Sequence, residues 1–164
     1  MRSRTILGAV VLTSAAAFVA CGSDSPAAVV TPPSVTYISQ LSGANERPNA
    51  NASMATGTAT YTLTGNSLAF IITVSGLTAP ASASHIHVGG AAVSGGVIVP
   101  FVTGSVQSGN VTSGTIDLST TVSNGTSTIT GDSLKVLLNN GNAYTNVHTS
   151  VNPGGEIRGQ IIKQ

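Results

Sequence analysis

The sequence contains little charge, few aromatic residues and almost no sulfur. Only 7% of its 164 residues are charged, and it has no tryptophan, three phenylalanines, three tyrosines and one cysteine. This composition predicts a core built from valine, isoleucine, leucine and alanine. A single cysteine excludes a disulfide bond within the chain.

The balance of charge excludes one class of partner. From residue 36 onward the sequence has four bases and four acids, so the net charge is zero. The bases are Arg47, Lys135, Arg158 and Lys163, and the acids are Glu46, Asp117, Asp132 and Glu156. A domain without excess positive charge cannot hold a phosphate backbone electrostatically. We therefore exclude nucleic acid as a partner.

The first 35 residues are typical of an exported protein. Arg2 and Arg4 precede an apolar stretch from Ile6 to Ala20, which is shorter than the ~20 residues of a membrane-spanning helix and fits a signal peptide. Residues 1–20, followed by Cys21, resemble a bacterial lipoprotein signal, which implies removal of the signal and lipidation of the cysteine. An ordinary secretory signal with an incidental Cys21 is the alternative interpretation.

Residues 21–35 are rich in serine, proline and alanine and lack periodicity. They predict a flexible tether between the lipid and a folded domain. We expect the protein to be exported to the cell envelope and held on a membrane by its lipid. The resemblance implies the outer membrane in a Gram-negative host, with the domain in the periplasm or at the cell surface.

From residue 36 onward the pattern becomes that of short strands. In "ATGTATYTLTG", Ala59, Tyr61 and Leu63 alternate with threonines, as in a strand buried on one face. About eight such segments are separated by turns, and "SLKVLLNNG" predicts one short helix, capped by Asp132 and ended by Gly141, before the last hairpin. Residues 36–164 thus predict an all-β antiparallel sandwich or a small barrel.

The three histidines lie in two segments that differ from the threonine-rich background. His85 and His87 in "SHIHVGG" are two residues apart and share one face of a strand, as do Asn146 and His148 in "NVH". If these strands are close, three imidazoles converge, and they suit zinc or copper. The alternative is that the histidines only bind backbone groups.

Charged residues predict a second feature near the chain's end. Glu156 and Arg158 in "GEIRG" share one face of the last strand, and Glu46 lies in "GANERP". Arginine favours bidentate pairing with a carboxylate. We predict a structural clamp in which Arg158 pairs with Glu46 or Glu156 and fixes the first motif to the final strand.

Four segments resemble the CHRD domain family, named after chordin. They are "LSGANERP", "ATGTATYTLTGNSL", "SHIHVGGAAVSGGVIVPF" and "GNAYTNVHTSVNPGGEIRGQI", in the family's order and spacing over nearly all of residues 36–164. The resemblance implies an extracellular β-sandwich of immunoglobulin-like, Greek-key type. It implies little about activity.

Three functions remain open from the sequence. The first is a non-enzymatic binding or surface structural module that meets an unidentified protein or surface partner. The second is copper or zinc binding through His85, His87 and His148. The third is a metal-dependent enzyme, for which Glu46 or Glu156 would be the candidate base. The sequence has no nucleophile-elbow motif, and we predict no catalytic residue.

Overall fold

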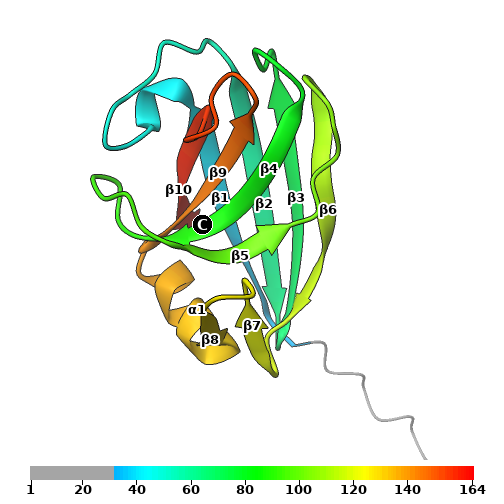
Figure 1. Cartoon of the computed structure of the whole chain (residues 1–164). Coiled ribbons are helices and arrows are strands. Elements are labelled where there is room, and N and C mark those ends of the chain that lie inside the picture. The colour runs from blue at the N-terminus through cyan, green and yellow to red at the C-terminus, as the bar shows by residue number, and fades with distance from the viewer. Residues whose placement is uncertain (1–31) are drawn as a thin grey trace, which may run out of the picture. The chain divides into compact units, whose positions relative to one another are not determined.

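The structure, a computed structural model, describes residues 32–164 (Figure 1). The predicted signal peptide, Cys21 and most of the predicted tether lie outside the described residues. The first strand begins at Ser34, two residues before the predicted start of the domain. None of the helices in residues 32–164 has the length and apolarity needed to cross a membrane.

The described residues form ten strands and two short helices. In chain order they are β1 (Ser34–Ser42), η1 (Gly43–Asn45), β2 (Thr56–Thr64), β3 (Ser67–Ser75), β4 (Ala81–Val88), β5 (Val97–Phe101), β6 (Gly109–Asp117), β7 (Thr121–Ser123), β8 (Thr128–Thr130), α1 (Gly131–Asn139), β9 (Ala143–Thr149) and β10 (Ile157–Lys163). Every strand pair is antiparallel. The all-β prediction is confirmed.

Eight strands form one continuous sheet in the order β5-β4-β9-β10-β1-β2-β3-β6. The sheet bends so that β4 and β5 cross over β2 and β3, as Figure 1 shows. A hydrogen bond of 2.8 Å between the hydroxyls of Tyr61 and Thr145 joins the two layers through the core. Phe70 and Phe101 pack between them with ring centroids 4.5 Å apart. The two layers of the predicted sandwich therefore belong to a single folded-over sheet.

Alternation along the strands sets the inner face. Ala59, Tyr61 and Leu63 of β2 are buried as predicted, while the intervening threonines lie on the outer face. The β2–β3 hairpin turns at Gly65, whose φ of 60° suits glycine. Tyr37 and Tyr61 are both fully buried, so tyrosines join the aliphatic residues expected in the core.

Two local predictions are corrected by the structure. Helix α1 begins earlier than expected, because Thr130 is its N-cap and accepts a hydrogen bond from the Ser133 N–H at 3.1 Å. Asp132 instead lies in the first turn, where the positive end of the helix dipole stabilises its carboxylate. Residues 121–130 form the small β7–β8 hairpin, so the described residues contain ten strands where the sequence predicted about eight.

Candidate metal centre

The outer face of β4, β9 and β10 carries a layer of buried and half-buried polar side chains. Alternation brings His85 and His87 of β4 to this face, next to Tyr144, Asn146 and His148 of β9. The strand register aligns His85 with Asn146 and His87 with Tyr144. Arg158 on β10 is opposite Asn146, and Gln160 is opposite Tyr144. This outer layer lies on the side of the sheet opposite the hydrophobic core.

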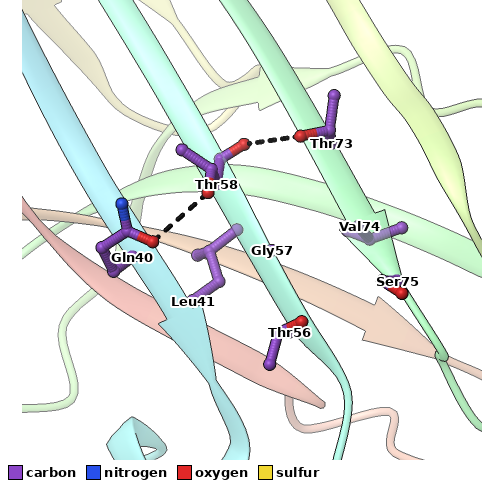
Figure 2. Close-up of a pocket in the computed structure, with 8 residues that line it drawn as sticks. All are labelled: Gln40, Leu41, Thr56, Gly57, Thr58, Thr73, Val74 and Ser75. Atoms are coloured by element: carbon purple, nitrogen blue, oxygen red, sulfur yellow. Dashed lines mark hydrogen bonds between the residues drawn. The ribbon is translucent and has the colours of Figure 1, made fainter.

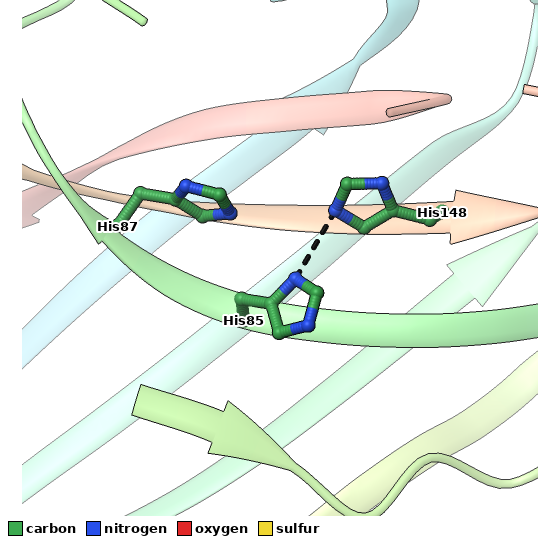
Figure 3. A group of neighbouring side chains, drawn as sticks. All are labelled: His85, His87 and His148. Carbon is green, nitrogen blue, oxygen red and sulfur yellow. Dashed lines mark hydrogen bonds between the residues drawn. The ribbon is translucent and has the colours of Figure 1, made fainter. Parts of the chain in front are cut away.

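The structure brings the three predicted histidines together. One ring nitrogen from each of His85, His87 and His148 lies within 4.8 Å of the others. Figure 3 shows the three rings around a common space, two from β4 and one from β9. The Nδ1 of His85 and the Nε2 of His148 are 3.1 Å apart. Two ligands on a tetrahedral zinc ion, with bonds of about 2.0–2.1 Å, are separated by roughly 3.3 Å, so this pair is near ligand spacing.

Backbone carbonyls fix two of the rings. The Nδ1 of His87 is 2.9 Å from the carbonyl oxygen of Gly95, and the Nδ1 of His148 is 3.0 Å from that of Pro153. Because a carbonyl only accepts, each Nδ1 carries the proton and each Nε2 offers a lone pair. The Nε2 of His87 is buried and has no hydrogen-bond partner within the described residues. Metal-bound histidines generally donate the N–H of their other ring nitrogen to a carbonyl or carboxylate, as Nδ1 of His87 and His148 does here.

The surroundings keep the imidazoles neutral. The pKa of His85 is lowered to about 4, mainly by burial and to a smaller extent by the neighbouring His148 and His87. Burial also lowers the pKa of His87 and His148, although their bonds to Gly95 and Pro153 act in the opposite direction. A metal ligand must be deprotonated, so neutral rings at pH 7 are suited to bind an ion.

Tyr144 packs against the face of the His87 ring. The two rings are stacked, with centroids 4.8 Å apart and planes at 12°. The Tyr144 hydroxyl donates to the Gly95 carbonyl at 3.2 Å and accepts from the Gly95 N–H at 3.1 Å. A Cβ at Gly95 would lie only 1.6 Å from the Val88 carbonyl oxygen. Only glycine therefore allows the loop to pass close enough to hold His87.

The predicted pairing of Arg158 with a carboxylate is wrong. The ion pair formed within residues 32–164 joins Lys135 and Asp132 at 3.0 Å. Arg158 instead lies over the ring of Tyr144, 3.4 Å from its centroid. Its Nη2 donates to the carbonyls of Gly90 and Val93 at 2.9 and 2.8 Å. The β4–β5 loop crosses this face and presents carbonyls where a carboxylate was expected. Arg158 therefore binds and holds that loop.

Glu156 is satisfied by neutral donors. It accepts from the hydroxyls of Ser53, Thr78 and Thr149 at 2.8, 2.7 and 2.6 Å, and from the Thr78 N–H at 2.8 Å. Burial would raise the pKa of Glu156, but these donors hold it below the ordinary value. The carboxylate fastens two loops to β9, which is a clamp of another kind than the one predicted.

Glu46 has a different environment. Its Oε2 accepts one hydrogen bond from Asn146 Nδ2 at 3.1 Å, while its Oε1 is buried without a partner among the described residues. Burial raises the pKa of Glu46 to about 7, and the bond from Asn146 and the charge of Arg158 offset only part of that effect. The first motif thus reaches the final hairpin through Asn146, the polar residue singled out beside His148.

A separate hollow on the surface lacks the groups that would make it a catalytic or metal site. It has a volume of about 310 Å³ around Gly57, on β1, β2 and β3 (Figure 2). Thr58 donates to Gln40 at 3.3 Å, and Thr73 donates to the Thr58 carbonyl at 3.4 Å. Its lining has hydroxyls and amides but no titratable group, so the histidine cluster is the better candidate site.

The fold and the cluster together define a small antiparallel β-domain with three loop-covered histidines on its outer face. Residues 37–161 match the family model described as the CHRD domain. The chain therefore belongs to the CHRD domain family. Comparisons with curated proteins and with solved structures gave no match.

The sequence contained a signal for the residues that the site prediction missed. Tyr144 and Gln160 lie at even spacing from His148 and Arg158, so period two assigns them to the same face. The part played by Gly95 had no such signal, because it depends on where a loop crosses the sheet.

Proposed function

We propose that this CHRD domain is a non-enzymatic module that binds one transition-metal ion, copper or zinc, through His85, His87 and His148. The observation that carries the proposal is the pair of Nδ1–carbonyl bonds at His87 and His148, which aim both Nε2 atoms at the space beside His85. Three neutral imidazoles are a ligand set that zinc and copper accept.

Binding requires a small local change at His85. In the metal-free domain its Nδ1–H donates to the Nε2 of His148, because the Nδ1 of His148 is engaged with Pro153. A metal would replace this hydrogen bond, and the His85 proton would move to Nε2. The ring stays neutral in both states, so metal binding at pH 7 should release little or no proton.

The non-enzymatic role is supported by the composition of the cluster. Within residues 32–164, the group of converging ligand atoms contains three histidines and no carboxylate. Glu46 is engaged with Asn146, and Glu156 is engaged with four donors. A metal-activated water would therefore have no carboxylate base in this cluster.

The test is a calorimetric titration of the chain with copper(II) and with zinc(II). We expect one ion per chain to bind, and we expect the heat to disappear in a variant with all three histidines changed to alanine. Because Cys21 is present in both proteins, it serves as an internal control for thiol binding. No heat at micromolar ion, or equal heat in the variant, would refute the proposal.

We also propose that the module is exported and anchored through a lipid on Cys21. The support is the sequence of residues 1–21, with Arg2 and Arg4 before an apolar stretch that ends at the cysteine. Labelled palmitate should enter the wild-type protein and not a Cys21→Ser variant. Equal labelling of both proteins would exclude this anchor.

A further inference from the structure

A second polar site lies beside the histidine cluster, beyond Tyr144. Two arginines border a cavity of about 90 Å³ whose lining is Asn45, Arg47, Ala91, Arg158 and Gln160. No acidic residue is in this lining. In a domain with equal numbers of acids and bases, two guanidinium groups at one cavity are a concentration of positive charge, and Glu46, the carboxylate that acts on both, is outside the lining and has a pKa raised to about 7.

The charge of Arg158 is the first reason to expect a ligand. The residue is 2% exposed and forms no ion pair within the described residues. Burying a charge is costly when it is not directly paired, and Glu46, the acid that acts on Arg158, is itself half protonated near pH 7. The recorded hydrogen bonds of Arg158, to Gly90 and Val93, both come from Nη2. A guanidinium has five N–H donors in a planar fork, so Nε and Nη1 are available for another acceptor.

Arg47 adds a second positive group. Its Nη1 donates to the carbonyls of Ala44 and Glu46 at 3.1 and 2.6 Å, which holds the side chain at the cavity. Burial lowers the pKa of Arg158, Tyr144 and Glu46 act in the opposite direction, and the positive charge of Arg47 adds a smaller lowering. An anion placed between the two guanidiniums would replace this repulsion with two attractions.

Gln160 adds a hydrogen-bond acceptor to the two arginine donors. Its Nε2 donates to the carbonyls of Gly89, Gly141 and Ala143 at 2.8, 2.7 and 2.8 Å, which fixes the amide. Its Oε1 is buried and has no partner within residues 32–164. A ligand with a hydroxyl donor would satisfy this acceptor.

We propose that the cavity binds a small oxyanion, a carboxylate or phosphate group that also carries a hydroxyl. The arginine forks match the paired oxygens of such a group, and Gln160 accepts from its hydroxyl. The site has none of the three histidines in its lining, so it does not depend on metal binding.

The test is a titration of the metal-free full chain, in the presence of a chelator, with inorganic phosphate, acetate and glycolate. Arginine Nε–H signals in the NMR spectrum should shift in a saturable way. For ligands of so few atoms we expect a dissociation constant on the order of 1 mM. Glycolate should bind more tightly than acetate, because only glycolate can donate to Gln160; equal affinity would refute that contact.

Two variants sharpen the test. Arg47→Gln removes one cation, and its side-chain bonds join only nearby carbonyls, so the fold should be kept while affinity falls about tenfold or more. Ala91→Leu should fill the cavity and abolish binding. Phosphate binding without carboxylate binding, or the reverse, would support the site and identify the source of the oxyanion.

The variant with all three histidines changed to alanine separates this inference from the proposed metal function. It should bind the anion as the wild type does, and Arg47→Gln should bind metal as the wild type does. Absence of saturable shifts up to about 20 mM of each anion would overturn the anion site. Equal binding in wild type, Arg47→Gln and Ala91→Leu would also overturn it.

Discussion

The two halves of the folded sheet use their outer faces differently. On β2, β3 and β6 the outer face consists mostly of threonine and serine, beside Ala69 and Ile71 of β3, and it is partly or fully exposed. On β4, β9 and β10 the outer face holds histidine, tyrosine, asparagine, arginine and glutamine under two loops. One sheet therefore has a plain exterior on one half and a second, polar interior on the other.

The comparison teaches what a polar interior requires. On the threonine half, water can satisfy every outward hydroxyl, so side-chain identity matters little to the fold. On the loop-covered half each polar atom needs a protein partner. Four buried side-chain atoms within residues 32–164 have none: Glu46 Oε1, His87 Nε2, Asn146 Oδ1 and Gln160 Oε1. All four belong to the covered half, which is where ligands are proposed.

The largest effect on stability should come from Glu156. Glu156→Gln replaces an acceptor of four hydrogen bonds with an amide that turns an N–H₂ toward donors. We expect the free energy of unfolding to fall by about 4 kcal/mol, because bonds to a charged group are worth roughly 1.5–3 kcal/mol each and some will be kept. Urea denaturation measures this change.

Glu46→Gln is the matched control for that variant. Glutamine keeps the acceptor for Asn146, and the native carboxyl is already half protonated near pH 7. We expect a loss below about 1 kcal/mol. Similar losses in both variants would mean that the two carboxylates do not differ in the way the hydrogen bonds indicate.

The next effect concerns the metal site alone. His87→Ala should weaken metal binding by about 100-fold or more, since loss of a supporting partner alone costs 10–100-fold. Tyr144→Phe keeps the stack on His87 but removes the hydroxyl that holds Gly95, so a smaller loss of affinity is expected. Calorimetry with each ion gives both values. Unchanged affinity in His87→Ala would remove that histidine from the site.

The dependence of stability on pH should show two opposing contributions. The pKa of His85 is lowered from 6.5 to about 4, so between these values the unfolded chain binds more protons and stability rises with pH. The pKa of Glu46 is raised from 4.5 to about 7, so between these values the native state binds more protons and stability falls with pH. The two contributions partly cancel between pH 4.5 and 6.5.

Variants separate these contributions. Glu46→Gln removes the falling part, so the free energy of unfolding should climb more steeply from pH 4.5 to 7, by about 1–3 kcal/mol over that range. The triple histidine variant should show the opposite change in slope. Urea denaturation at a series of pH values measures both. An unchanged slope in Glu46→Gln would indicate a carboxyl with an ordinary pKa.

The smallest effect should come from the exposed half. Thr115 lies on the edge strand β6 and is exposed. Thr115→Val keeps the β-branched shape, so the free energy of unfolding should change by less than about 0.5 kcal/mol, and metal binding should be unaffected. A large loss would show that the threonine face carries a packing role that its exposure does not indicate.

The sequence by itself determined the class of fold and the shared face of the histidines on their strands, whereas Glu156, expected on the last strand with Arg158, precedes β10. Period-two alternation is a local property of a strand, and it assigned the inner face of β2 and the shared face of His85 and His87. The order and spacing of the family-like segments identified the CHRD domain, which the family model confirmed.

Tertiary structure decided which partner each side chain meets. Arg158 was expected to find a carboxylate, but the β4–β5 loop offers carbonyls at that point, and Glu156 meets hydroxyls from two other loops and β9. Such partners come from segments distant in the chain, so no local pattern encodes them. The convergence of His148 with His85 and His87 has the same origin: β4 and β9 are neighbours only because the sheet places strands far apart in sequence side by side.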